Sequence, residues 1–381
     1  MPDLRCPRGS VDEFRGQFTH LRGTNMAHHS RIAVRVSTAM ITAALAVGAV
    51  APAHAGPTHG KANGNQYSFG VIGDTPYGAD ALAEFPSQIE QMNQDGSLRF
   101  VAHVGDIKAG SQRCDTDYFE TIYSHFESFT MPFVFTPGDN DWTDCHRVNN
   151  GMYNPLERMT VLRHIFFAEP HHTLGGKNMH LNSQVSAGFP ENSTFEQKGL
   201  SFGVINVQGS NNGLLPWTGL GLSEPTTEQL AEEQARTENN VEVIRQTFAT
   251  AEQKHRRAVV IMTQADMFDP SYTDPTAETH SGFQETVDEI SRLSREFGKP
   301  VYLINGDSHV FNDDYPLAEG SRWLEVYGQD PVPNLHRITV DGDDAADNYM
   351  RFTVNPETPG AASGKKPARE DVLSYERIPF E

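Results

Sequence analysis

Short, fully apolar segments recur along the chain and alternate with longer stretches in which apolar residues have helical spacing. Six of these segments have the pattern of buried strands: 67–72, 99–104, 132–136, 200–207, 258–263 and 300–304. Helical spacing is clearest at Val241, Ile244 and Phe248, and again at Val287 and Ile290. Because continuously apolar strands separated by helices are typical of parallel sheets, we expect an α/β fold. Its mostly parallel central sheet has helices outside.

The remaining segments complete this layered picture. Residues 154–168 have helical spacing and predict another packed helix, whereas residues 175–196 and 209–225 are polar or rich in Gly, Asn and Pro. We expect those two segments to be long surface loops. Three short strand-like runs predict added antiparallel strands near the C-terminus, and they centre on Val326, Ile338 and Phe352.

The N-terminal part has the order of a secretory signal peptide. Arg31 and Arg35 precede an apolar run at 39–50, and small residues follow up to Ala55, where cleavage is expected. A membrane anchor is the alternative, but the run is shorter than the roughly 20 residues that span a bilayer. The chain therefore divides into an upstream extension foreign to the native protein (1–25), a signal peptide (26–55), a flexible lead-in (56–65) and one large domain (66–381).

Charge narrows the range of partners. The chain has 50 acidic residues and 30 Lys and Arg residues, which gives a formal net charge of −20. Removal of the expected leader makes this charge more negative, because its charged residues are mostly Arg. A surface this acidic repels nucleic acid and anionic lipid. We therefore expect no nucleic acid as a general partner and no membrane insertion after signal cleavage.

Cysteine content agrees with export. Of three cysteines, Cys6 falls in the upstream extension, which leaves Cys114 and Cys145 in the large domain. Two cysteines in a protein outside the cytoplasm usually pair, so we expect a disulfide between them. The alternative is two unpaired buried thiols.

Candidate chemistry collects where the predicted strands end. Five polar clusters follow apolar segments: Gly73-Asp74, Gly105-Asp106, Gly138-Asp139-Asn140-Asp141, Gln264-Ala265-Asp266 and Gly306-Asp307-Ser308-His309. One Asp after a strand commonly caps the next helix, but four Gly-Asp pairs close four separate strands. In an open α/β sheet, ligands bind beyond the carboxyl ends of strands. Carboxylates gathered there repel one another unless a cation or protons neutralise them.

The order of these clusters resembles that of calcineurin-like metallophosphoesterases, whose motifs are D-x-H, G-D, G-N-H-D/E, H and G-H-x-H at successive strand ends. The resemblance runs from about Tyr67 to Leu317 and implies a layered metallophosphoesterase-like fold with one or two metal ions. One implied ligand set is Asp74, Asp106 and His309. Asp106 then bridges to a second ion, contacted by Asp139, Gln264 and Asp307.

Three positions depart from the family motifs. Pro76 stands where the first motif has a His, Asn140 replaces the catalytic His, and Gln264 replaces the fourth-motif His. Fewer imidazoles and more carboxylates favour Mn, Mg, Ca or Fe ions over Zn. The segment Gly138–Arg147 resembles a secreted bacterial branch of the superfamily more closely, with the pattern Gly-Asp-Asn-Asp/Glu-Trp-Thr-Asp-Cys-His-Arg.

Other polar residues near these motifs are candidates for the missing roles. The expected catalytic residues are Asn140, Asp141, His146 and Arg147. Lys108 and Arg158 are the expected substrate contacts, because cations bind phosphate oxygens. For Arg158 a surface or helix-pairing role is the alternative, and for His103 a hydrogen-bonded core position is favoured over a general acid.

The resemblance implies a secreted metal-dependent phosphoesterase. It would hydrolyse phosphate mono- or diesters of a phosphorylated small molecule by a metal-activated water. The alternative is a catalytically impaired protein that binds a metal or a phosphorylated ligand on the same fold, since fold does not fix function. The absent His residues favour this alternative, and the retained carboxylates favour metal chemistry.

Overall fold

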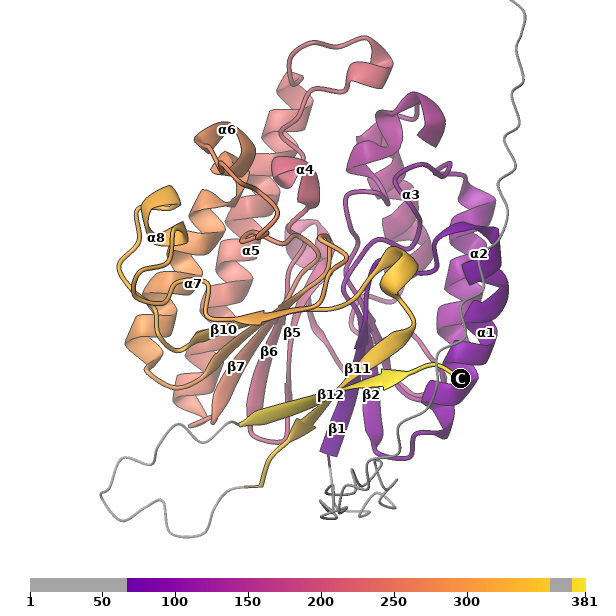
Figure 1. Ribbon diagram of the computed structural model, residues 1–381. Helices are drawn as coiled ribbons and strands as arrows, with labels where there is room; N and C mark the ends of the chain where they lie inside the picture. The colour runs from indigo at the N-terminus through magenta and orange to yellow at the C-terminus, as the bar shows by residue number, and fades with distance from the viewer. Residues whose placement is uncertain (1–66, 357–371) are drawn as a thin grey trace, which may run out of the picture. The chain divides into compact units, whose positions relative to one another are not determined.

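The computed structural model describes residues 67–356 and 372–381, and their strands form two sheets (Figure 1). The expected extension, signal peptide and lead-in lie outside the described residues. The first sheet has the order β12-β11-β1-β2-β3. Its strands are β1 (Tyr67–Ile72), β2 (Leu98–His103), β3 (Phe133–Phe135), β11 (Asn348–Val354) and β12 (Leu373–Pro379). Strands β1 to β3 are parallel, and β11 and β12 are antiparallel additions.

The second sheet has the order β4-β5-β6-β7-β8-β10-β9. Strands β6, β7, β8 and β10 are parallel, while β4, β5 and β9 pair in the antiparallel sense. Its strands are β4 (Asn182–Gln184), β5 (Phe189–Gln197), β6 (Leu200–Val204), β7 (Ala258–Met262), β8 (Val301–Asn305), β9 (Asn312–Asp314) and β10 (Leu335–Thr339).

Helices cover the outer face of each sheet (Figure 1). Helices α1 (Gly78–Gln94), α2 (Thr116–Glu127) and α3 (Pro155–Phe166) share a core with β1 to β3. Helices α5 (Thr227–Gln253), α7 (Gln284–Phe297) and α8 (Trp323–Val326) share another with β7, β8 and β10. The remaining α-helices are α4 (Gly209–Asn212) and α6 (Ala277–His280). Short 3-10 turns are η1 (Thr143–His146), η2 (Val148–Asn150), η3 (Val185–Ala187), η4 (Thr218–Leu220), η5 (Ser281–Phe283) and η6 (Asp343–Ala345).

A third core joins the two sheets face to face. The rings of Phe69 on β1 and Phe100 on β2 stack at 4.9 Å between centroids. Phe202 on β6 meets them edge-on at 5.6 and 5.7 Å, and all three side chains are fully buried. Aromatic pairs of this kind add about 0.5–1.5 kcal/mol each beyond their buried area. The sheets therefore form the two inner layers, and the helices the two outer ones.

The predicted α/β class, parallel strands, outer helices and C-terminal antiparallel strands are confirmed. The strands divide between two sheets, where the sequence predicted one central sheet. The run around Val326 is helix α8, and the run around Ile338 is β10, which pairs parallel with β8 and antiparallel with β9. Strand β4 and most of β5 lie in the segment 175–196 that was predicted to be a loop. Strand β5 was missed because its buried residues include polar Asn192 and Ser193. Within 67–356 and 372–381, none of the helices combines the length and apolar character needed to cross a bilayer.

Candidate metal centre

The carboxyl ends of strands from both sheets supply the acidic side chains of one site. Asp74 follows β1 and Asp106 follows β2 in the first sheet, while Asp307 follows β8 in the second. These residues are in the left-handed region, with φ of 51° at Asp74, 60° at Asp106 and 74° at Asp307. Such strained conformations of non-glycine residues cost about 1–3 kcal/mol each and occur mostly at functional sites.

Three carboxylates form the centre of the site. Asp106, Asp139 and Asp307 each place an oxygen within 4.8 Å of the others. The amide of Gln264 donates to all three, at 3.2, 3.3 and 2.9 Å respectively. Its oxygen accepts the Gly209 N–H at 2.7 Å. In this orientation, Gln264 offers the cluster hydrogen-bond donors, whereas the sequence predicted an oxygen ligand.

Glycines allow the carboxylates to approach the backbone this closely. A Cβ at Gly138 would lie 1.9 Å from Asp106 Oδ1. A Cβ at Gly209 would lie 2.6 Å from oxygens of both Asp139 and Asp307. These distances leave no room for a side chain. Residue 138 must therefore be Gly, because the Asp106 carboxylate after the neighbouring strand β2 occupies the space of a Cβ atom.

Asp74 and His309 lie beside this cluster. Asp74 Oδ2 accepts the Asp307 N–H at 3.0 Å, and its Oδ1 lies 3.3 Å from His309 Nε2. Burial lowers the pKa of His309, but Asp74, Asp343 and Asp139 together raise it more, so the net pKa is raised. The structure therefore brings together the residues that the family resemblance assigned to one ion, Asp74, Asp106 and His309.

Electrostatics shows what such a cluster needs. Burial raises the pKa of Asp106 and of Asp307 well above the usual range, and neighbouring aspartates raise both further. Burial likewise raises the pKa of Asp74, against the opposing effect of His309. A bound cation removes the need for protons by supplying positive charge to the carboxylates. Because the donors are mainly carboxylate oxygens, the site fits hard ions such as Mg²⁺, Mn²⁺ or Ca²⁺.

Asp141 and Asn140 hold the Asp106 loop. Asp141 is fully buried, and its oxygens accept the N–H groups of Gly138, Asp106 and Ile107 at 2.7, 3.1 and 2.9 Å. Burial raises the pKa of Asp141 to about 7. Asn140 donates its side-chain amide to Asp106 Oδ2 at 2.9 Å. Through these contacts both residues position Asp106, and the catalytic roles expected from the sequence stay a prediction.

The predicted cations differ in their access to the site. Lys108 is fully buried, and burial lowers its pKa despite the nearby Asp141 and Asp106 carboxylates. Arg147 is 39% exposed and pairs with Asp144 at 2.5 Å. It is therefore the more accessible of the two cations. His146 accepts the Gly219 N–H at 3.3 Å. Burial, and to a smaller extent the positive charge of Arg147, lowers the pKa of His146 to about 4.

Arg158 and the cysteines form a support behind the site. The Cys114–Cys145 disulfide is confirmed, with 5.8 Å between Cα atoms, and joins the loops that follow β2 and β3. Arg158 donates to Cys114 O at 2.9 Å and Thr116 Oγ1 at 3.1 Å, and its guanidinium lies over Tyr153. Because these partners occupy a buried guanidinium, Arg158 supports the loop, and its expected contact with substrate is not favoured.

His103 is a core residue, as the sequence favoured. Its Nδ1 accepts the Gly105 N–H at 3.1 Å, so Nε2 carries the proton and donates to Thr75 O at 2.8 Å. Burial lowers its pKa to about 4. The imidazole is therefore neutral at pH 7 and links the two loops that carry Asp74 and Asp106.

Sequence reasoning missed Ser210, in the loop after β6. Its hydroxyl donates to Asp139 Oδ2 at 2.8 Å. Ser210, Asn211 and Asn212 all have left-handed φ, from 52° to 58°. The sequence run Gly209-Ser210-Asn211-Asn212 was compatible with a plain turn or with Asn211 and Asn212 reaching the site, and nothing in it pointed to Ser210.

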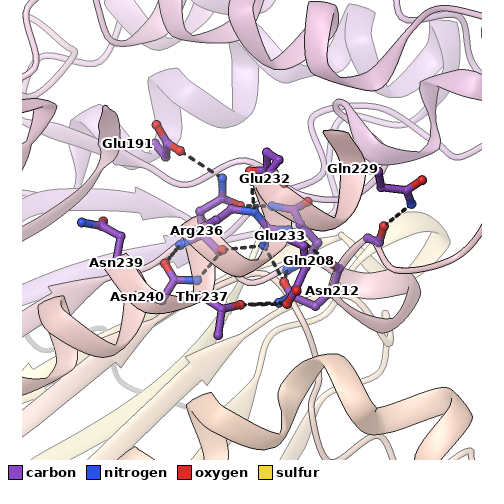
Figure 2. Close-up of polar contacts among 12 residues, drawn as sticks. Glu191, Gln208, Asn212, Gln229, Glu232, Glu233, Arg236, Thr237, Asn239 and Asn240 are labelled. Carbon is purple, nitrogen blue, oxygen red and sulfur yellow. Dashed lines mark hydrogen bonds and ion pairs between the residues drawn. The ribbon is translucent and has the colours of Figure 1, made fainter. Parts of the chain in front are cut away.

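Buried Arg236 of α5 holds this strained loop (Figure 2). Its guanidinium donates to Asn212 Oδ1 at 2.5 Å, to Asn212 O at 2.9 Å and to Asn206 O at 3.1 Å. Its Nε donates to Glu232 at 2.9 Å. The Asn212 amide in turn donates to Gly282 O at 3.0 Å. This network fixes the backbone that presents Ser210 to the acidic cluster.

Comparison with known proteins gives only distant structural similarity. The sequence matches no protein-family model, and no curated protein is significantly similar to it. One similar solved structure is that of GAP50, the anchor in the inner membrane complex of Plasmodium. The alignment covers 83% of this chain and 89% of the GAP50 chain, at 10% identity and a TM-score of 0.43.

Two proteins of Thermus thermophilus also align at 10% identity. Sulfate thiohydrolase SoxB gives a TM-score of 0.37 over 79% of this chain and 43% of its own. A 5'-nucleotidase precursor gives a TM-score of 0.38, and the alignment covers 83% of this chain and 54% of the precursor. The chain thus spans about half the length of these two proteins. Similarity at this level carries no functional argument, so the function must be argued from the geometry of the site.

Proposed function

We propose that this protein is a metal-dependent hydrolase of phosphate mono- or diesters of a small molecule. The observation that carries the proposal is the cluster of Asp106, Asp139 and Asp307, whose carboxylates gather within 4.8 Å at strand ends of both sheets. Asp74 and His309 extend this donor set. One or two bound ions would polarise a phosphate oxygen and lower the pKa of a water molecule.

The surrounding residues support phosphate binding more than proton transfer. Arg147 is accessible at the edge of the site, and a guanidinium matches phosphate oxygens in geometry and charge. Lys108 adds a buried positive charge near the carboxylates. Asn140 carries no titratable proton, and His146 is neutral at pH 7. We therefore expect the enzyme to prefer esters with good leaving groups, since a positioned acid typically contributes 10²- to 10⁴-fold.

Export is part of the proposal. The Cys114–Cys145 disulfide supports an oxidising compartment, since such bonds are rare in the cytosol. The signal-like segment 26–55 points the same way. We propose that the domain acts outside the cytoplasm, either in the cell envelope or in the medium.

A binding protein without turnover is the second candidate. Two observations favour it: the Gln264 oxygen is bonded to Gly209, and Asn140 holds Asp106 by its amide. Such a protein would keep the metal and bind a phosphorylated ligand without hydrolysing it. The two candidates predict the same metal content and differ only in turnover.

The test combines metal analysis with hydrolysis of an aryl phosphate monoester and diester. The purified protein is stripped of metal and reloaded with Mg²⁺, Mn²⁺, Ca²⁺, Fe or Zn²⁺ in turn. We expect hydrolysis with at least one hard ion, its loss in Asp106→Asn, and its retention in Glu120→Gln, which removes an exposed charge on α2. Bound metal without turnover would favour the binding protein, and a protein that binds none of these ions would refute both candidates.

A further inference from the structure

A cavity of about 760 Å³ lies beside the metal centre, between the first turns of α1 and the turn η6. Thr75, which follows Asp74 in the chain, lines one side of it. Asp343 lines another side, where its N–H donates to Asp74 O at 2.9 Å and its carboxylate lies 3.9 Å from His309 Nδ1. The cavity has the size of a small-molecule site. Because its walls are attached to two proposed metal ligands, a molecule bound at the metal centre can extend into it.

The lining of this cavity is acidic. The ion pairs of the described residues engage one of its carboxylates, that of Asp343 with His309. Helix α1 begins here, and its N-terminus adds about half a positive charge, which the carboxylates exceed. Within 67–356 and 372–381, the lining includes no Lys, Arg or His and has six acidic side chains: Asp80, Glu84, Asp343, Asp344, Asp347 and Glu381. The cavity therefore attracts positive charge.

These carboxylates are too dispersed to hold an inorganic ion. In the part of the chain that the structure describes, the only three acidic, His or Cys side chains close enough together for one ion are Asp106, Asp139 and Asp307. Carboxylates spread around a cavity of ligand size suit a cation on an organic framework. The rings of Tyr77 and Phe380 also line the cavity, and aromatic faces attract ammonium groups. The expected ligand is therefore an organic cation.

Thr75 gives a separate indication of a ligand. It lines the cavity although only 5% of its surface is exposed. Its carbonyl accepts a hydrogen bond from His103, but among the described residues its hydroxyl has no partner. A polar group that is buried without a hydrogen bond costs free energy, which a donor on a ligand in the cavity would remove. An ammonium group supplies up to three such donors.

We propose that this cavity binds a positively charged amine on the alcohol part of the substrate, which makes the substrate class phosphate esters of amino alcohols. The phosphate binds at the metal centre, and the ammonium group lies near Thr75 and the carboxylates of α1 and η6. The inference rests on the proposed function for the place of the phosphate, but it does not depend on turnover. The net charge of −20 supports the same class, because an ammonium group offsets the repulsion of a phosphate anion.

The test compares amine-bearing phosphates with neutral molecules of the same shape. Ethanolamine phosphate is compared with propyl phosphate, and aminobutyl phosphate with pentyl phosphate, by titration calorimetry on the Mn²⁺-loaded full-length protein. Two chain lengths are used because they place the ammonium at different distances from the phosphate. We expect at least one amine to bind about tenfold or more tightly than its neutral counterpart, as a charge-assisted hydrogen bond would produce.

Variants of the protein show whether the cavity is responsible. Asp80→Asn combined with Asp344→Asn removes one carboxylate from each wall and should reduce the preference for the amine about threefold or more. Thr75→Val removes the hydroxyl at similar volume and should also reduce the preference. Both variants should bind propyl phosphate like the parent. The matched control, Glu120→Gln combined with Glu252→Gln, removes two exposed charges outside the cavity and should keep the full preference. Circular dichroism verifies that the variants fold.

Three results would overturn the inference. They are equal affinity for amine and neutral counterpart at both chain lengths, an unchanged preference in the Asp80/Asp344 or the Thr75 variant, and an equal loss of preference in the control. A preference for the amine without hydrolysis of any ester would support the cavity assignment and count against the proposed enzyme. Hydrolysis of amine and neutral esters with equal rates and affinities would do the reverse, so the two proposals fail separately.

Discussion

Replacing Asp106 by Asn should stabilise the metal-free protein and remove its response to metal. In the absence of a cation, burial and four neighbouring aspartates raise the pKa of Asp106 well above its usual value of 3.8. A folded state that keeps this carboxyl protonated at pH 7 is destabilised by at most about 4 kcal/mol relative to the unfolded chain. An amide in its place carries no such cost, since it does not ionise.

The amide has a smaller cost of its own. Asp106 Oδ2 accepts amide N–H groups of Asn140 at 2.9 Å and of Gln264 at 3.2 Å. If the Asn at position 106 points its oxygen at the backbone N–H of Asn140, its own NH₂ group faces these two amide donors and cannot accept their hydrogen bonds. Losing one or two such bonds costs about 1–2 kcal/mol. The net gain for the metal-free variant is therefore about 2–3 kcal/mol.

Metal should reverse the order of stability. A ligand at a thousandfold excess over its Kd stabilises the folded parent by about 4 kcal/mol, and the variant gains little because it lacks the central ligand. Urea denaturation followed by circular dichroism, with EDTA and then with Mn²⁺ at pH 7, measures both states. Glu120→Gln removes an exposed charge and should behave like the parent.

The result has a clear refutation. If Asp106→Asn is less stable than the parent in EDTA, the cluster is not destabilised by its own charge. If the variant is still stabilised by metal as strongly as the parent, Asp106 is not a central ligand. Either result would remove the electrostatic argument on which the metal centre rests.

Three further predictions concern the frame around the site. Changing both Cys114 and Cys145 to Ser should lower the free energy of unfolding in urea by about 3–4 kcal/mol, given their separation of 31 residues. His103 has a folded pKa of about 4, below its usual 6.5, so its contribution to stability is lost as pH falls between these values. In urea titrations at successive pH values, the free energy of unfolding should fall by about 3 kcal/mol more in the parent than in His103→Gln. Arg236→Met should lower stability by about 3 kcal/mol, because Asn212 loses two buried partners, and circular dichroism on heating measures this.

Apolar continuity made most of the parallel strands predictable. Strand β1 runs from Tyr67 to Ile72, as the sequence predicted, because every residue in it is buried. Strand β5 was not predictable from that signal, since Asn192 and Ser193 are buried through hydrogen bonds and sheet pairing. The division into two sheets was also hidden, because strands of either sheet have the same apolar pattern.

The acidic cluster was predictable for a different reason. Parallel strands in a sheet end at the same edge, so the Gly-Asp pairs after β1, β2 and β3 place their carboxylates together, and Asp307 after β8 joins them from the second sheet. Ser210 was not predictable, because its position depends on the path of a loop through left-handed residues. The orientation of Gln264 depends on Gly209, which comes from another strand. Single-sequence patterns carry no information on such contacts between loops.

The energetics of the site argue that its strain and charge are retained for binding a cation. Left-handed conformations at Asp74, Asp106 and Asp307 each cost about 1–3 kcal/mol, and their buried carboxylates add to this cost. Asp141 offsets part of this cost by accepting three backbone hydrogen bonds, which hold the loop in its strained conformation. A core that served stability alone would replace these carboxylates with apolar groups, since buried charges rarely improve stability. The protein instead uses buried polar support to keep its carboxylates close together, which is the arrangement that a hard cation requires.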